Sequence, residues 1–95
     1  MLRIQVSNKR ERQEFEHPAG PLEFGRGGPR NGVPRCTVQD LYVSKDHVRL
    51  EEKDRNLVHV ENLSQRNSIR LTDNSLLPTR ESREVDAPAR LTVAQ

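Results

Sequence analysis

Apolar residues recur with a period of two along this chain, and this alternation constrains its fold more than any other feature. Residues 2–6, 48–51 and 58–61 alternate apolar and polar side chains. Such alternation places every second side chain on one face, as in a β-strand with one buried face. Residues 91–93 continue the pattern near the end of the chain, so we expect a further strand there.

Clusters of turn-forming residues separate these runs. Proline, glycine, asparagine and aspartate dominate them, because these residues adopt tight turns at little cost. The clusters fall at residues 18–21, 27–29, 31–32, 53–56 and 72–74. The charged stretch 8–16 has only Phe15 as an apolar anchor, and we interpret it as a hairpin tip leading into a strand. Short strands separated by turn signals predict an all-β sandwich or barrel.

The length and composition limit the protein to a single small domain. The chain has 95 residues, of which 32% are apolar and 3% aromatic. We therefore expect one domain spanning residues 1–95, with a thin core of Val, Leu and Ile. The net charge of +2 is far from the excess typical of proteins that coat nucleic acid.

Cysteine and histidine usage argues against a disulfide and a metal site. Cys36 is the single cysteine, and the three histidines fall at unrelated spacings. The N-terminus lacks the apolar run of a signal peptide, and no segment has the length to span a membrane. We expect a cytoplasmic protein without cofactor, metal or membrane contact.

Four short motifs stand in order where strands are expected to meet loops. They are Gly25-Arg26, the S-x-x-H element at residues 44–47, Asn62, and Asn67 five residues later. In order and spacing they resemble the forkhead-associated (FHA) family, which carries G-R, S-x-x-H and D/N-L-x-x-x-N-G elements. The resemblance extends over residues 2–93. It implies an FHA-like (SMAD/FHA) β-sandwich of two antiparallel or mixed sheets with about eleven short strands.

The resemblance also implies a function, the binding of phosphothreonine on a partner protein. Arg26, Ser44 and Lys45 would hold the phosphate, since a forked guanidinium, a hydroxyl and an ammonium group all donate to its oxygens. Asn67, with Arg66 beside it, would bind the backbone of an extended peptide. The partner would be the substrate of a serine/threonine kinase, and the chain a monomer or the N-terminal module of a larger bacterial signalling protein.

Three further residues are expected to support the site rather than touch the ligand. Gly25 would let the chain turn sharply so that Arg26 points outward. His47 would brace the binding loops from beneath, and Asn62 would tie its own loop together. Each site residue also has a plainer interpretation: a solvated arginine, a serine that caps a turn, or an asparagine in a tight turn.

The sequence departs from the family pattern in the loop after Asn62. Ser68 stands where the family has glycine, and Arg66 stands where threonine or serine is common. A serine at φ > 0 costs about 1 kcal/mol, so the loop either carries that strain or adopts another turn. The long loop 27–35, with Arg30 and Arg35, is expected to tune selectivity.

Three alternative functions have to be weighed against phosphothreonine binding. An FHA-like fold without phosphate dependence would serve as a constitutive docking module. A nucleic-acid-binding domain lacks support, because the chain has only three aromatic residues for stacking and no predicted helix to enter a groove. A hydrolase built on Ser44, Asp46 and His47 lacks a glycine-flanked nucleophile turn, and on a strand-like junction the serine and histidine point apart. We therefore expect no enzyme.

Overall fold

Nine β-strands joined by turns make up the part of the chain that the structure, a computed structural model, describes: residues 1–9 and 12–93. The strands are β1 (Leu2–Ser7), β2 (Arg12–His17), β3 (Pro21–Gly25), β4 (Arg35–Thr37), β5 (Val48–Asp54), β6 (Leu57–Asn62), β7 (Ile69–Arg70), β8 (Leu76–Leu77) and β9 (Ser82–Asp86). Over these residues the chain has no helix of the length and apolarity needed to cross a membrane.

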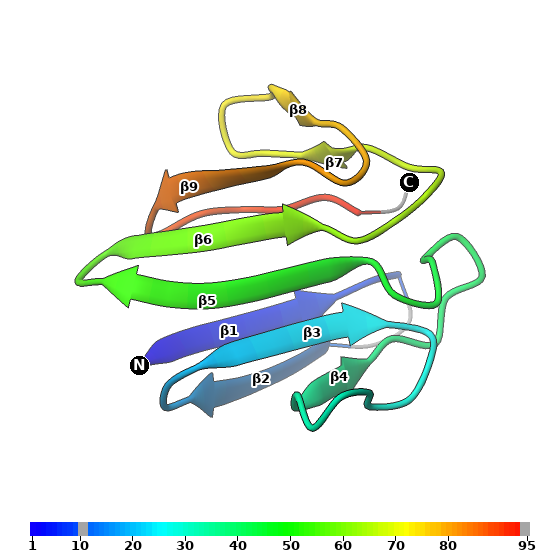
Figure 1. Ribbon diagram of the computed structural model, residues 1–95, viewed down its shortest axis with the longest axis horizontal. Helices are drawn as coiled ribbons and strands as arrows, with labels where there is room; N and C mark the ends of the chain where they lie inside the picture. Colours follow the sequence, from blue (N-terminus) through cyan, green and yellow to red (C-terminus); the bar gives the residue numbers. More distant parts are fainter. Residues whose placement is uncertain (10–11, 94–95) are drawn as a thin grey trace.

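The strands form one five-stranded sheet and two hairpins (Figure 1). The large sheet has the order β4-β3-β5-β6-β9. Its β3–β4 pair is parallel and its other pairs are antiparallel, so the sheet is mixed. β1 pairs with β2 and β7 with β8. The β1–β2 hairpin is the one predicted around residues 8–16, although residues 10–11 of its tip lie outside the described part.

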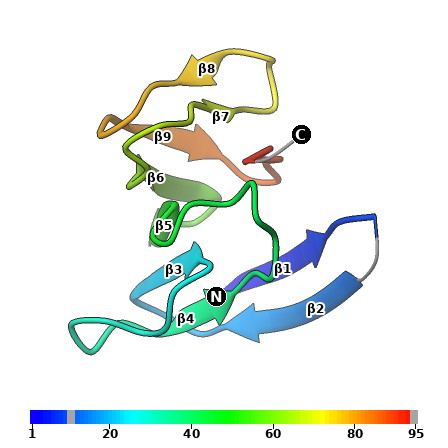
Figure 2. The same cartoon turned by 90° about the vertical axis from the view of Figure 1, so that its right-hand side faces the viewer.

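The hairpins form a second layer against the large sheet. β1 and β2 pass behind β3 in Figure 1 and stand to one side of it in Figure 2. Both layers contribute to the core: it contains Val48, Val58 and Val60 from the large sheet and Ile69 and Leu77 from the β7–β8 hairpin. All eight buried hydrophobic residues of the described chain are Val, Leu or Ile, which confirms the predicted thin aliphatic core. The molecule is therefore an all-β sandwich, as predicted.

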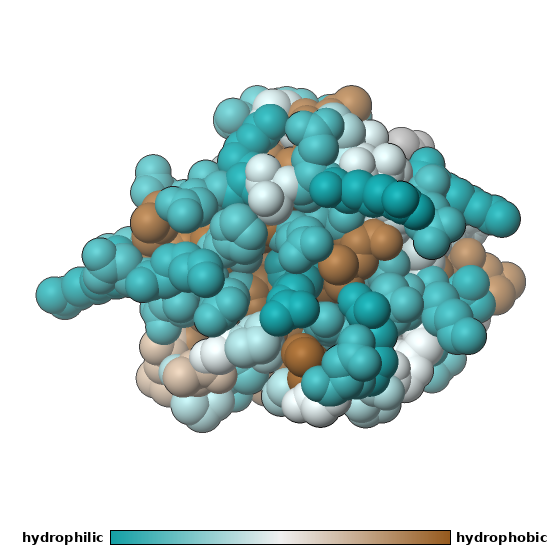
Figure 3. Space-filling view, viewed as in Figure 1, coloured by the Kyte–Doolittle hydropathy of each residue, from teal (hydrophilic) through white to brown (hydrophobic). Residues whose placement is uncertain are grey.

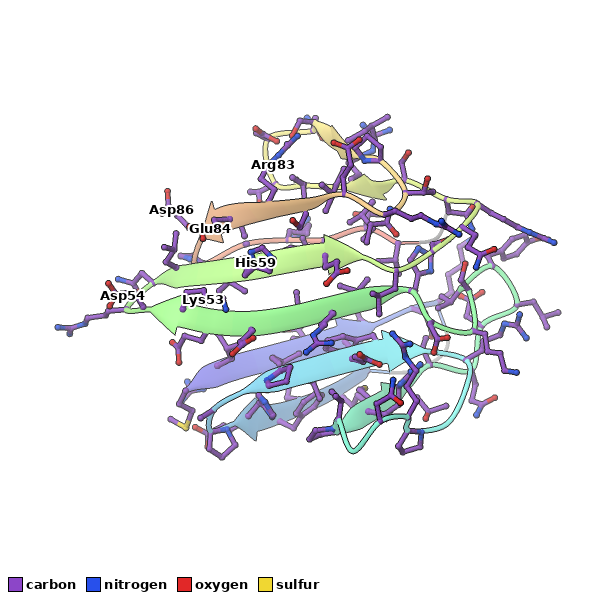
Figure 4. The ribbon with its side chains drawn as sticks, in the orientation of Figure 1. Lys53, Asp54, His59, Arg83, Glu84 and Asp86 are labelled. Carbon is purple, nitrogen blue, oxygen red and sulfur yellow. The ribbon has the colours of Figure 1, made fainter. Side chains whose placement is uncertain are left out.

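The outer face of the large sheet is polar because burial alternates along its strands. In β6 the valines at 58 and 60 are buried, while His59 between them faces outward. His59 lies opposite Glu84 of β9 and Glu51 of β5. Figure 4 shows His59 and Glu84 side by side across these strands.

Two details differ from the sequence-based expectation. The described residues contain nine strands instead of about eleven, and residues 91–93 form no strand. Thr92 makes only an isolated bridge with Arg70, through hydrogen bonds of 2.8 and 2.9 Å. Arg70 belongs to β7, which is two residues long and pairs with β8 on its other side.

The predicted turns form where the sequence placed them. Asn31 and Gly32 have φ angles of 53° and 72°, as a two-residue type I′ turn requires, and Arg30 bridges Val33 across them. Asn56, with φ of 64°, closes the turn between β5 and β6. Asparagine tolerates this left-handed region better than other non-glycine residues, and this explains why these turns could be predicted.

Candidate functional site

The predicted site residues gather at one end of the sandwich. β3 ends at Gly25, β5 begins at Val48 and β6 ends at Asn62. Val48 pairs with Phe24, the residue before Gly25, on one side and with Asn62 on the other. Consequently the loops 26–34, 38–47 and 63–68 meet at the same edge, on the right-hand side of Figure 1.

The Arg26 loop and the Ser44 loop are joined by backbone hydrogen bonds. The Arg26 amide donates to the Ser44 carbonyl at 3.0 Å, and the Gly27 amide donates to the Lys45 carbonyl at 2.9 Å. The Nε of Arg26 donates to the Val43 carbonyl at 2.7 Å, which orients its exposed side chain. Within the described residues, the two Nη atoms of Arg26 and the Nζ of Lys45 have no protein partner. These cationic donors therefore remain free for a ligand.

Close approach between the two loops explains the glycines at positions 25 and 27. A Cβ atom on Gly25 would lie 2.2 Å from the Lys45 carbonyl oxygen and 2.7 Å from Nη1 of Arg35. A Cβ atom on Gly27 would lie 2.8 Å from Cγ of Lys45. Neither glycine has a positive φ. The structure thus gives Gly25 a different reason from the sharp turn that we expected.

His47 is fully buried beneath the loops and connects three segments. Its amide donates to the Phe24 carbonyl at 2.9 Å, and its carbonyl accepts from the Leu63 amide at 2.8 Å. Its Nδ1 accepts a hydrogen bond from the Ser44 amide at 3.0 Å, so Nδ1 itself carries no hydrogen. Desolvation by burial lowers the pKa of His47 below its ordinary value. His47 therefore holds the Ser44 backbone in place as a neutral ring.

A buried serine that the sequence analysis did not single out, Ser64, sets the orientation of Ser44. Its hydroxyl accepts from the amides of Arg66 and Asn67, each at 3.1 Å, and lies 2.7 Å from the Ser44 hydroxyl. Because a hydroxyl has two lone pairs and one hydrogen, Ser64 with both lone pairs engaged donates its hydrogen to Ser44. The hydrogen of Ser44 is then free to donate into the groove.

Asn62 fixes the shape of the loop that carries Asn67. Its Nδ2 donates to the carbonyls of Asn67 at 2.8 Å and Leu77 at 3.0 Å, and its Oδ1 accepts from the Ser64 amide at 3.0 Å. Asn67 itself is exposed. Ser68 is absent from the residues with positive φ, so this loop adopts a turn that avoids the strain considered above.

A groove opens between these loops, with a volume of about 1210 Å³. Among the described residues of its lining, four are cationic, namely Arg26, Lys45, Arg66 and Arg70, and one, Asp46, carries a carboxylate. That carboxylate is occupied by Arg35 at 2.6 Å, and this hydrogen bond is the main reason why the pKa of Asp46 is lowered. The free charge facing the groove is therefore positive, which favours an anionic ligand.

Apolar side chains also line this groove. Leu41, Tyr42 and Leu76 are exposed by 87%, 73% and 49%, and they are three of the four exposed large hydrophobic residues in the described chain. Figure 3 shows such hydrophobic patches as isolated spots on a largely hydrophilic surface, one of them at the right-hand edge. A ligand in the groove would thus meet both charge and apolar surface.

Arg30 and Arg35 do not line the groove, although they were expected to tune selectivity. The Arg35 side chain is fully buried and contacts Glu23 and Asp46. Arg30 is 38% exposed and pairs with Glu23 at 3.0 Å. Arg35 is therefore engaged within the protein, while Arg30 is paired with Glu23 and remains partly exposed.

The geometry also bears on a hydrolase built on Ser44, Asp46 and His47. The His47 ring accepts from the backbone amide of Ser44 and not from its hydroxyl. The Asp46 carboxylate is hydrogen-bonded to Arg35 and not to the histidine ring. Since a catalytic triad needs both of those missing hydrogen bonds, these three residues are not arranged as one.

Comparison with solved structures identifies the fold. The chain is similar to the FHA domain of the CT664 protein from Chlamydia trachomatis, with a TM-score of 0.69 and 14% identity over 95% of this chain and 84% of the other. It is also similar to the FHA domain of an Arabidopsis thaliana hypothetical protein, with a TM-score of 0.64 and 17% identity over 99% and 75%. No family model and no curated protein matches the sequence. The chain therefore has the FHA fold, and the predicted resemblance is confirmed at the level of the fold.

Proposed function

We propose that this domain binds phosphothreonine on a partner protein, through the groove at the loop end of the sandwich. The observation that carries the proposal is a convergence of free donors. Arg26, Ser44 and Lys45 all line one groove, and each has a hydrogen-bond donor in its side chain. A phosphate ester offers three strong acceptor oxygens and about −1.5 to −2 charges, which suits such a set of donors.

The expected selectivity follows from the strength of these contacts. Two or three hydrogen bonds to a charged group contribute about 1.5–3 kcal/mol each. They would favour the phosphorylated peptide over its unphosphorylated form by about two to six orders of magnitude in affinity. Binding would be reversible and micromolar, because the groove is open and the rest of the peptide lies on its surface.

The remainder of the groove fits an extended peptide. The Asn67 side chain is exposed, lines the groove and has no hydrogen-bond partner among the described residues, so its amide can bind a peptide backbone. Arg66 beside it is exposed and lines the same groove. We propose that the domain acts without catalysis, as a protein-interaction module of the cytoplasm within a larger signalling chain.

A titration with matched peptides tests this function. Fluorescence polarisation would follow a degenerate phosphothreonine peptide library, its phosphoserine counterpart and its unphosphorylated counterpart. The variant Arg26→Ala should lose binding of the phosphothreonine set while it keeps its melting temperature. Arg55→Ala serves as the matched control, because Arg55 is an exposed arginine in the turn between β5 and β6.

The results distinguish phosphothreonine binding from phosphate-independent docking. Saturable binding of the phosphothreonine set that is lost in Arg26→Ala and kept in Arg55→Ala would support the proposal. Equal binding of phosphorylated and unphosphorylated peptides would replace it with a constitutive docking module. Absence of binding to every set would also reject the phosphate site.

A further inference from the structure

A buried ion-pair cluster of Glu23, Arg35 and Asp46 lies behind the loop that carries Ser44. The side chains of Arg35 and Glu23 are 0% and 2% exposed, while that of Asp46 is 36% exposed. Nη2 of Arg35 lies 3.1 Å from Oε1 of Glu23 and 2.6 Å from Oδ1 of Asp46. One guanidinium therefore joins β3 and β4 to the loop 38–47.

The same guanidinium also fixes the peptide bond after Lys45. Nη1 of Arg35 donates to the Lys45 carbonyl at 2.8 Å, and the Gly27 amide donates to the same oxygen at 2.9 Å. A carbonyl oxygen has two lone pairs, so both are engaged. Arg35 thus holds two successive residues, Lys45 and Asp46, immediately after Ser44.

Two further arginines surround the buried carboxylate. Nε of Arg30 lies 3.0 Å from Glu23, and Nη1 of Arg49 lies 3.6 Å from it. Burying charges costs free energy unless the geometry is good, and a buried network that is retained can serve to specify one arrangement of the chain. Here the arrangement specified is that of the loop 38–47.

We infer that Arg35 is a positioning residue for the phosphate site. Through Asp46 and the Lys45 carbonyl, it fixes the loop that presents Ser44 and Lys45 to the groove. It does so without touching the ligand, because its side chain is fully buried. The part of this inference that concerns affinity for a phosphorylated ligand rests on the function proposed above.

Neutralising Asp46 separates positioning from simple charge. Asp46 lines the groove, so its negative charge repels an anionic ligand. If charge were its only influence, Asp46→Asn would bind phosphate more tightly than the wild type. Positioning predicts the opposite sign, since asparagine offers a neutral oxygen in place of the carboxylate and therefore holds the loop to Arg35 more weakly.

The experiment compares Asp46→Asn, Arg35→Lys and the control Glu84→Gln by two independent measurements. Lysine at position 35 keeps the charge but lacks the planar fork that reaches both the carbonyl and the carboxylates. Glu84 is an exposed residue of β9, and its replacement makes the same change in net charge as Asp46→Asn. One measurement is the affinity for the degenerate phosphothreonine library. The other is amide hydrogen exchange of the unliganded protein.

The expected result is a local change with a matching loss of affinity. The Gly27 amide should exchange about tenfold faster, relative to the β6 amides, in both Asp46→Asn and Arg35→Lys. Their affinity for the phosphothreonine library should fall about tenfold to a hundredfold, since the charge-assisted hydrogen bond between Arg35 and Asp46 is weakened in one variant and disrupted in the other. Glu84→Gln should match the wild type in exchange and should bind no more weakly.

Two results would overturn the inference. One is unchanged relative exchange of Gly27 in both variants, and the other is phosphopeptide binding by Asp46→Asn at least as tight as that of Glu84→Gln. Failure of the proposed function looks different: the wild type itself would not prefer phosphorylated peptide. In that case the exchange of Gly27 alone still decides whether Arg35 fixes the loop.

Discussion

Replacing Ser64 with alanine tests how the buried hydroxyl organises the groove. This hydroxyl has three partners, the Ser44 hydroxyl at 2.7 Å and the amides of Arg66 and Asn67 at 3.1 Å each. Each such hydrogen bond contributes about 0.5–1.5 kcal/mol net. Because residues 66 and 67 are exposed, water replaces part of what is lost. We expect the free energy of unfolding to fall by about 1–3 kcal/mol.

This loss should be measurable both as stability and as affinity. For a domain of this size, 1 kcal/mol corresponds to about 4–8 °C in melting temperature, so Ser64→Ala should melt about 5–20 °C lower. The variant should also bind the phosphothreonine library about tenfold more weakly, because Ser44 loses the partner that directs its hydrogen into the groove. Circular dichroism melting and fluorescence polarisation would record the two effects.

Ser68→Ala is the matched control for this prediction. Ser68 lies in the same loop, is exposed, and has a hydroxyl without a hydrogen-bond partner among the described residues. Its replacement should change the free energy of unfolding by less than about 0.5 kcal/mol. If Ser64→Ala and Ser68→Ala had the same melting temperature and the same affinity, the argument from the Ser64 lone pairs would be refuted.

Three further predictions follow from the contacts around the groove. Gly25→Ala should abolish phosphopeptide binding in the same titration, because its Cβ would meet the Lys45 carbonyl oxygen at 2.2 Å and displace the loop. His47→Ala should lower the free energy of unfolding by about 2–4 kcal/mol in a denaturant titration, through a cavity and a lost hydrogen bond. Burial holds the pKa of His47 below 6.5, so its contribution to stability is complete above pH 6.5 and declines as the pH falls below that value; melting curves from pH 7.5 to 5 should show this decline in the wild type and a weaker one in His47→Gln.

The strand pattern and the motif positions could be predicted from the sequence because they depend on local signals. Alternation marked β1, β5 and β6, and the asparagine-glycine pair at 31–32 marked a turn, which in the structure has the φ angles of type I′. The predicted lining residues Arg26 and Asn67 do lie on one groove, as motifs at the ends of adjacent strands should. The number of strands could not be predicted, because whether residues 91–93 form a strand depends on their pairing with a segment distant in the sequence, which here is limited to the bridge between Arg70 and Thr92.

The supporting contacts were out of reach of sequence reasoning because they join distant positions. In the sequence, Ser64 has the character of an ordinary polar loop residue. Only the fold shows that it is buried against Ser44. Glu23 continues the alternation of its strand on the outward face, where it would be expected in solvent, but the arginines of neighbouring segments cover it. From the sequence alone, Arg35 likewise cannot be distinguished from the many surface arginines. A charged residue is buried only when its partners arrive from elsewhere in the chain.

The measurement that tests the central claim most directly is a two-dimensional ¹⁵N–¹H NMR titration with a phosphothreonine peptide selected from the library. The account predicts chemical-shift changes at the amides of Arg26, Ser44 and Asn67 and at the side-chain Nε–H of Arg26, and none from the unphosphorylated peptide. Shift changes on the outer face of the large sheet, around His59 and Glu84, with the same response to both peptides, would contradict it.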